Sequence, residues 1–76
     1  MNRVNHPTNR QRALQVIAAM TGEWLRIQVL AARARLTVRS MTRYLTQAKK
    51  ARVVENRQLN GRYGVHICEW RRKDGA

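Results

Sequence analysis

The chain has 76 residues, of which 16 are Lys or Arg and four are Asp or Glu, so its net charge is +12. This length suits a single domain, and an apolar content of 43% is that of a folded chain rather than a disordered one. No apolar run is long enough for a membrane span or a signal peptide, so we expect a cytoplasmic protein. The single cysteine, Cys68, excludes an intramolecular disulfide.

Most of the positive charge comes from arginine, and the acids are unevenly distributed along the chain. Only three of the 16 cations are lysines (Lys49, Lys50 and Lys73), so the other 13 are arginines, and no acid lies between Glu23 and Glu55. Self-repulsion at this density opposes a compact state unless a polyanion offsets it. Arg suits bidentate contacts to phosphate and guanine. A nucleic-acid partner is therefore favoured over the alternative, a basic domain that binds none.

The first predicted helix begins near Asn9, because Thr8 and Gln11 have the spacing of a capping box. Residues 1–8 before it are expected to form a flexible arm. Gly22 is expected to end this helix in a left-handed conformation. Helical spacing predicts an inward face made of Ala13, Leu14, Ile17, Ala18 and Met20.

Two more helices are predicted, separated by a tight turn. Residues 23–25 are too short for more than a one-bridge strand, and a helix over 26–33 follows without a good N-cap. Its apolar side is formed by Ile27, Leu30, Ala31 and Ala34. Leu36 fills the turn, and Thr37 caps a helix from Val38 to about Lys50. In that helix Met41, Tyr44, Leu45 and Ala48 face the core, and Arg39, Thr42, Arg43, Thr46 and Lys50 face the other way.

A β-hairpin is predicted to follow. Residues 53–58 and 63–70 have strand character, and Asn60-Gly61 between them is the dipeptide of a type I′ turn. A hairpin centred there pairs Leu59 with Arg62, Asn56 with Val65, and Val54 with Ile67, and the last pair covers the helices. Residues 71–76 are expected to form a basic tail. The aromatic residues are expected in the core or at its rim: Trp24, Tyr44, Tyr63 and Trp70.

This order of elements resembles the winged helix-turn-helix family of small bacterial and phage regulators over residues 9–70. The resemblance is carried by Leu30-Ala31, Leu36-Thr37, Ser40-Met41 and Tyr44-Leu45. It implies an α+β fold of three helices with a C-terminal two-stranded β-hairpin wing. Two glycines usual in the family are replaced by Arg35 and Arg52. Either these arginines adopt the left-handed conformation, at a cost of roughly 1 kcal/mol each, or the turns differ.

The resemblance also implies a function, namely double-stranded DNA binding by a small transcriptional regulator that acts as a repressor and associates with the nucleoid. Residues 38–50 would enter the major groove, and a wing at about 57–63 would reach the minor groove or the backbone. The expected base contacts are Val38, Arg39, Thr42 and Arg43. The expected backbone and wing contacts are Thr37, Thr46, Lys49, Lys50, Arg57 and Arg62. One helix and one wing cover a short site, so a homodimer or adjacent copies on DNA are expected.

Other interpretations remain open at this point. The same fold would serve a sequence-tolerant architectural, replication or recombination factor, or a protein-interaction module. The exposed arginines would then be a solvated helix face, and the charged wing a protected sheet edge. Residues 24–43 alone resemble a membrane-surface peptide, but such a peptide does not need a hairpin. RNA is disfavoured because no aromatic stacking platform is evident.

The sequence gives little basis for catalysis or metal binding. His66 and Cys68 share a strand face, but a structural zinc site needs four ligands and a Cys-His nucleophile needs a third orienting group. Four scattered acids and no glycine-rich loop exclude paired-carboxylate and phosphate-loop chemistry. We therefore expect no enzyme, no metal, no cofactor and no small-molecule ligand.

Overall fold

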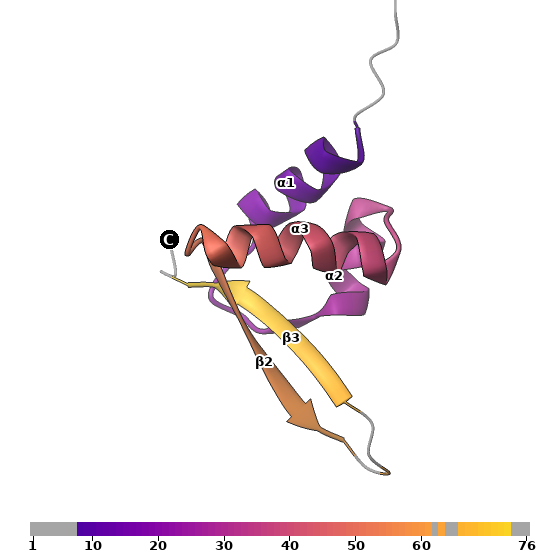
Figure 1. Ribbon diagram of the computed structural model, residues 1–76, viewed down its shortest axis with the longest axis vertical. Helices are drawn as coiled ribbons and strands as arrows, with labels where there is room; N and C mark the ends of the chain where they lie inside the picture. Colours follow the sequence, from indigo (N-terminus) through magenta and orange to yellow (C-terminus); the bar gives the residue numbers. More distant parts are fainter. Residues whose placement is uncertain (1–7, 62, 64–65, 74–76) are drawn as a thin grey trace, which may run out of the picture.

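The computed structural model describes residues 8–61, 63 and 66–73. Its elements are α1 (Asn9–Ala19), β1 (Leu25–Arg26), α2 (Ile27–Ala34), α3 (Val38–Lys50), β2 (Val54–Asn60) and β3 (His66–Arg72). The strands form one antiparallel sheet in the order β1-β3-β2. The helices gather at one end of this sheet, and β2 and β3 run on beyond them as a wing (Figure 1). The fold is therefore the α+β, three-helix winged helix-turn-helix that the sequence predicts.

Helix α1 begins as predicted and ends earlier. The Gln11 amide donates to Thr8 Oγ1 (3.1 Å), and the Thr8 amide donates to Gln11 Oε1 (2.9 Å), which completes the capping box. The helix ends at Ala19, and its C-cap Met20 has extended backbone (φ −67°, ψ 150°). The prediction that Gly22 ends this helix is therefore wrong.

The buried stripe of α1 is narrower than expected. It consists of Ala13 and Ile17, continued by Met20, whereas Leu14 is 48% exposed and Ala18 is also exposed. Positions 13, 17 and 20 follow one line along a helix, and positions 14 and 18 lie about 100° further round it. The prediction of Leu14 and Ala18 as inward residues is wrong for this reason.

The two turns around α3 use arginine in the left-handed conformation. Arg35 has φ 56° and ψ 41°, and the next amide, that of Leu36, donates to the Ala31 carbonyl (2.9 Å). Arg52, which follows α3, has φ 62°. The sequence left open whether Arg35 and Arg52 adopt the left-handed conformation or the turns differ. The positive φ angles confirm the left-handed conformation at both residues. Thr37 caps α3 by accepting from the Ser40 amide (3.1 Å), as predicted.

The core joins all three helices to the sheet. Helix α2 starts one residue later than predicted, at Ile27, and its N-cap Arg26 makes no side-chain capping bond. Its four predicted apolar residues are buried, as are Met41 and Leu45 of α3. From the sheet, Val54 and Trp70 close the core with 1% and 2% exposure. The buried residues are Ala13, Ile17, Met20, Ile27, Leu30, Ala31, Ala34, Met41, Leu45, Val54 and Trp70.

The register of the hairpin differs from the prediction. Val54 pairs with Arg72, Asn56 with Trp70, and Asn60 with His66. Asn60 is thus the last residue of β2, and the two-residue turn at Asn60-Gly61 is replaced by a longer connection, part of which lies outside the described residues. The predicted pairs Leu59 with Arg62, Asn56 with Val65 and Val54 with Ile67 are wrong.

The burial of Trp70 explains this register. A shift by an odd number of residues moves every side chain of a strand to the other face of the sheet. The observed register places Trp70 on the same face as Val54, against the helices, and leaves Ile67 on the opposite face. Burying the large indole outweighs the local preference of Asn-Gly for a tight turn.

The ends of the sheet also differ from expectation. A short strand beside the hairpin is confirmed, but it spans Leu25–Arg26 rather than residues 23–25 and makes two pairs, Leu25 with Trp70 and Arg26 with Glu69. Strand β3 includes Arg71 and Arg72, which the sequence assigned to a tail, because Arg71 pairs with Glu55 and the Arg72 amide donates to the Thr21 carbonyl (2.8 Å). The rest of that tail, 74–76, and the arm over 1–7 lie outside the described residues.

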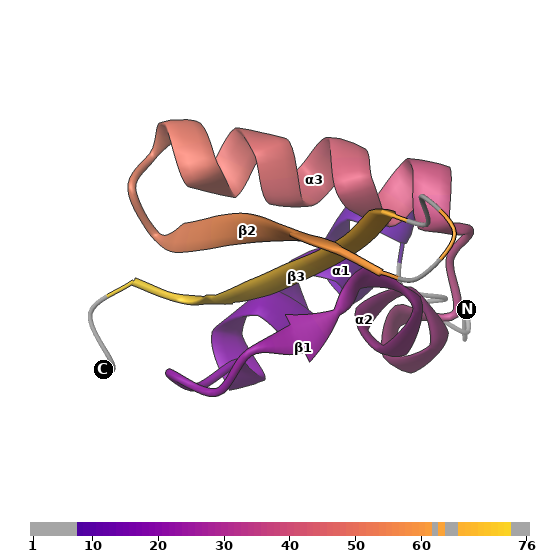
Figure 2. The same cartoon turned by 90° about the horizontal axis from the view of Figure 1, so that it is seen from below.

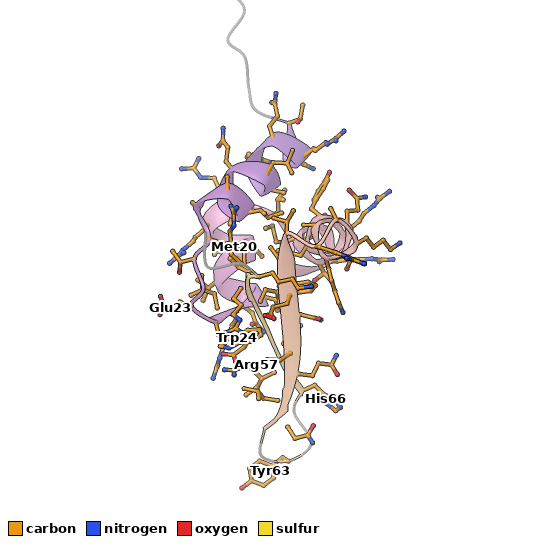
Figure 3. The ribbon with its side chains drawn as sticks, turned by 90° about the vertical axis from the view of Figure 1, so that its left-hand side faces the viewer. Met20, Glu23, Trp24, Arg57, Tyr63 and His66 are labelled. Atoms are coloured by element: carbon orange, nitrogen blue, oxygen red, sulfur yellow. The ribbon has the colours of Figure 1, made fainter. Side chains whose placement is uncertain are left out.

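Tyr63 lies at the tip of the wing, far from the helices (Figure 3). Its side chain is 101% exposed, and its backbone φ is 62°. The prediction of Tyr63 as a core or rim residue is wrong, because the longer hairpin carries it beyond the helices. Tyr44 and Trp24, by contrast, are partly buried as expected.

Candidate nucleic-acid interface

The exposed side of α3 is a stripe of basic and hydroxyl side chains. Met41 and Leu45 are fully buried and fix which side of the helix faces the core. At about 100° per residue, Arg39, Arg43, Thr46 and Lys50 lie on the opposite side. All four are exposed, and α3 lies beside β2 at the edge of the sheet away from β1 (Figure 2). The predicted orientation of α3 is confirmed, while the DNA contacts assigned to these residues stay predictions.

The threonines of α3 direct their hydroxyl protons back into the helix. Thr42 Oγ1 donates to the Val38 carbonyl (2.7 Å), and Thr46 Oγ1 donates to the Thr42 carbonyl (2.8 Å). Each side chain therefore keeps a methyl group and an acceptor oxygen for a partner. Val38 is 42% exposed at the start of the helix. This end of α3 thus combines apolar surface with the guanidinium of Arg39.

The two faces of the wing differ in chemistry. Figure 3 shows Arg57 on the same side of the sheet as Trp24, and His66 on the side of α3. His66 is paired with Asn60, and Gln58 is two residues before Asn60, so these side chains share one face. All three are exposed. The sequence analysis did not assign these three residues to the interface. Gln58 and Asn60 share the face of Val54 by strand alternation alone, whereas His66 lies on this face only in the register that buries Trp70.

Arg57 has its charge matched within the sheet. Its guanidinium donates to Glu69 Oε1 from Nε (2.8 Å), and Nη2 lies 2.8 Å from the same oxygen in an ion pair. The same group lies 4.3 Å from the centroid of the Trp24 ring. Arg57 is still 43% exposed, so its predicted contact with DNA remains a prediction, from a face turned away from α3. Arg62, the other predicted wing contact, lies outside the described residues.

The acids of the described residues are all placed away from α3. They are Glu23, Glu55 and Glu69, of which Glu55 pairs with Arg71 (3.1 Å) and Glu69 with Arg57. Glu23 lies on the side of Trp24 in Figure 3, and the two paired acids share the sheet face of Arg57. Helix α3 itself contains four cations and no acid. The molecule therefore presents a positive field on the side of α3 and a mixed-charge surface behind the sheet.

Within 8–61, 63 and 66–73, no three His, Cys, Asp or Glu side chains come together as metal ligands. In the same part of the chain, no helix has both the length and the apolar character needed to cross a membrane.

Comparison with known proteins gives a likeness of fold. No family model and no curated protein matches the chain. Among solved structures, it is similar to a possible transcriptional regulator from Methanosarcina mazei Go1, with a TM-score of 0.68 and 16% sequence identity. The match covers 79% of this chain and 52% of the other, so this chain spans about half of its neighbour's length. At this identity the likeness shows the fold alone.

Proposed function

We propose that this protein binds double-stranded DNA sequence-specifically, as a small transcriptional regulator that represses by occupying its site. The observation that carries the proposal is the solvent-facing stripe of α3, which bears Arg39, Arg43, Thr46 and Lys50 and has no acid beside it. The similarity in fold to a possible transcriptional regulator supports the same role.

In this proposal α3 lies in the major groove with its N-terminal half toward the bases. Arg39 and Arg43 are four residues apart and share one exposed line along the helix. Each can donate two hydrogen bonds to a guanine, which contributes about 1–3 kcal/mol of discrimination against another base. Val38 and the methyl of Thr42 supply apolar contact for a thymine methyl.

Phosphate contacts would position the helix and the wing. Lys49 and Lys50 in the last turn of α3 and the hydroxyls of Thr37 and Thr46 are assigned to the backbone. Gln58, Asn60 and His66 extend this surface along the wing, since they face the same side as α3. Arg57 and Arg62 complete the proposed wing contacts. One helix and one wing read a short sequence, so we propose a homodimer or adjacent copies on DNA.

The test is the double variant Arg39→Ala, Arg43→Ala. The specificity ratio is the affinity for the preferred duplex divided by the affinity for random duplex. We expect the variant to lower this ratio at least tenfold, which corresponds to a loss of about 1.4 kcal/mol in base discrimination. The matched control is Arg26→Ala, Arg33→Ala, which removes two exposed cations outside α3. It should weaken both affinities alike and leave the ratio unchanged. A ratio that survives in the α3 variant would show that the reading face is assigned wrongly.

A sequence-tolerant architectural, replication or recombination factor is the second candidate. It is favoured by the cations at the margins of α3. Arg35 and Arg52 are exposed in the turns before and after α3, outside the helix that is proposed to contact bases. Affinity would then come from phosphates, and about five neutralised phosphates would give a log–log salt slope near −4.5. Equal affinity for all duplexes at one salt concentration would distinguish this candidate from the first.

A further inference from the structure

An apolar groove lies between α1 and the C-terminal half of α3. Its volume is about 280 Å³, and its apolar walls are Leu14 and Ile17 of α1, Tyr44 and Ala48 of α3, and Val53 after it. The exposed Arg10 lines it as well. In Figure 1, α1 lies beside α3, on the side of α3 that is opposite the wing.

This groove keeps large apolar side chains in contact with water. Leu14 is 48% exposed and Val53 is 36% exposed, although both line the groove together with the buried Ile17. Burying such side chains contributes roughly 25 cal/mol per Å² of apolar surface removed from water. The volume is slightly below the roughly 300–1,000 Å³ of pockets that enclose small molecules. The groove therefore suits one or two side chains that project from a larger partner.

The charge around the groove selects the kind of partner. Arg10 is part of the lining, and neither α1 nor α3 contains an acid. Lys50 and Arg52 flank Ala51, which also lines the groove. A second copy of this chain would bring another +12 charge to the same place. A partner with carboxylates beside its apolar side chains would find complementary charge instead.

We propose that this groove docks an acidic amphipathic helix of a partner protein. An apolar stripe on such a helix would fill the space between Leu14, Tyr44 and Val53, and its flanking carboxylates would face Arg10 in the lining. The groove residues of α3 lie about 120° around the helix from the stripe of Arg39, Arg43 and Lys50, at about 100° per residue. The docking site is thus distinct from the proposed base-reading surface, and its existence does not depend on DNA binding.

The experiment uses a fluorescent peptide and the full chain. The probe is a helix of about 18 residues with Leu at positions i, i+3, i+4 and i+7 and Glu or Ala elsewhere, long enough to form a helix on binding. Its control is a scrambled peptide of the same composition. Fluorescence anisotropy at near-physiological salt should show binding of the amphipathic peptide at least about tenfold tighter than that of the scrambled one, since only the former presents an apolar anchor.

Val53 and Val29 form a matched pair of variants. Both are exposed valines (36% and 39%), but only Val53 lines the groove. Val53→Gln should weaken binding of the peptide about fivefold, as expected for one anchor contact, and Val29→Gln should leave it unchanged. Leu14→Gln, at an exposed position of the opposite wall, should repeat the effect of Val53→Gln. Thermal melts of each variant establish that the fold is retained.

Four results would overturn the proposal. Equal affinity for the scrambled peptide would mean that charge alone drives binding. Equal loss in the Val29→Gln and Val53→Gln variants would mean that the groove is not the site. A dimer in sedimentation velocity that Val53→Gln dissociates would identify a second copy as the occupant. Binding to anionic vesicles that Val53→Gln abolishes would identify a lipid surface.

Discussion

The guanidinium of Arg57 lies 4.3 Å from the centroid of the Trp24 ring. The guanidinium of Arg71 lies 4.4 Å from the same centroid. Arg57 belongs to β2 and Arg71 to β3, and each pairs with a glutamate on the other strand of the hairpin. Trp24, just before β1, is therefore held by both strands of the wing. This cluster ties the base of the wing to the segment before β1 on the side away from α3.

Replacing Trp24 with Leu should lower the free energy of unfolding by about 1–2 kcal/mol, because it removes two cation–π contacts and part of the packing against the sheet. Urea denaturation followed by circular dichroism measures this change. Trp24→Phe keeps a ring for the two guanidinium groups and should fall between the wild type and Trp24→Leu. Equal stability of Trp24→Leu and wild type would show that the cluster adds nothing to stability.

Replacing Arg35 with Gly should stabilise the protein by about 0.5–1 kcal/mol. Arg35 has φ 56°, where a side chain costs about 1–2 kcal/mol, and the greater freedom of glycine in the unfolded chain offsets part of that gain. Arg33→Gly, inside α2, should instead destabilise by about 1 kcal/mol. Thermal unfolding compares the two variants, which lose the same side chain. A lower Tm for Arg35→Gly would contradict the left-handed turn.

Replacing Thr37 with Ala should destabilise the protein by about 1 kcal/mol, because it removes the acceptor of the Ser40 amide at the start of α3. Thr37→Ser keeps that oxygen and should retain most of the stability. Chemical denaturation of the two variants separates loss of the cap from loss of the threonine methyl. Similar losses in both would argue that the cap bond is not the source of the effect.

Replacing Lys49 and Lys50 with Ala should reduce the steepness of the salt dependence of DNA binding. If both neutralise phosphates, the log–log slope becomes smaller by roughly 1.8, at about 0.9 per contact. Binding titrations at several salt concentrations give this slope. The Arg26→Ala, Arg33→Ala variant removes the same charge elsewhere and should leave the slope nearly unchanged. An equal change in both variants would mean that only the net charge matters.

Local signals in the sequence predict the helices well. The capping box at Thr8 and Gln11 and the cap at Thr37 set where α1 and α3 begin, and these signals depend only on neighbouring residues. The hairpin register was mispredicted, because it depends on contacts that are distant in sequence. Asn60-Gly61 favours a tight turn, but burial of Trp70 against the helices and the pairing of Arg57 with Glu69 select another register.

In the candidate interface, too, features set by neighbouring residues could be predicted and features set by distant contacts could not. The exposed stripe of α3 could be predicted, because the helical period and the apolar residues Met41 and Leu45 define its opposite side. The β3 part of the wing surface could not, because the register decides which alternate residues of β3 face α3. The observed register puts His66 of β3 on that side and Ile67 on the other, the reverse of the predicted arrangement.

The most direct test of the proposed function is selection of bound duplexes from a random pool at near-physiological salt, followed by sequencing. We expect a compact enriched motif containing guanine, repeated as half-sites if the protein binds as a dimer or in adjacent copies, and lost in the Arg39→Ala, Arg43→Ala variant. Strong retention of DNA without any enriched motif, or no retention at all, would contradict sequence-specific binding by α3.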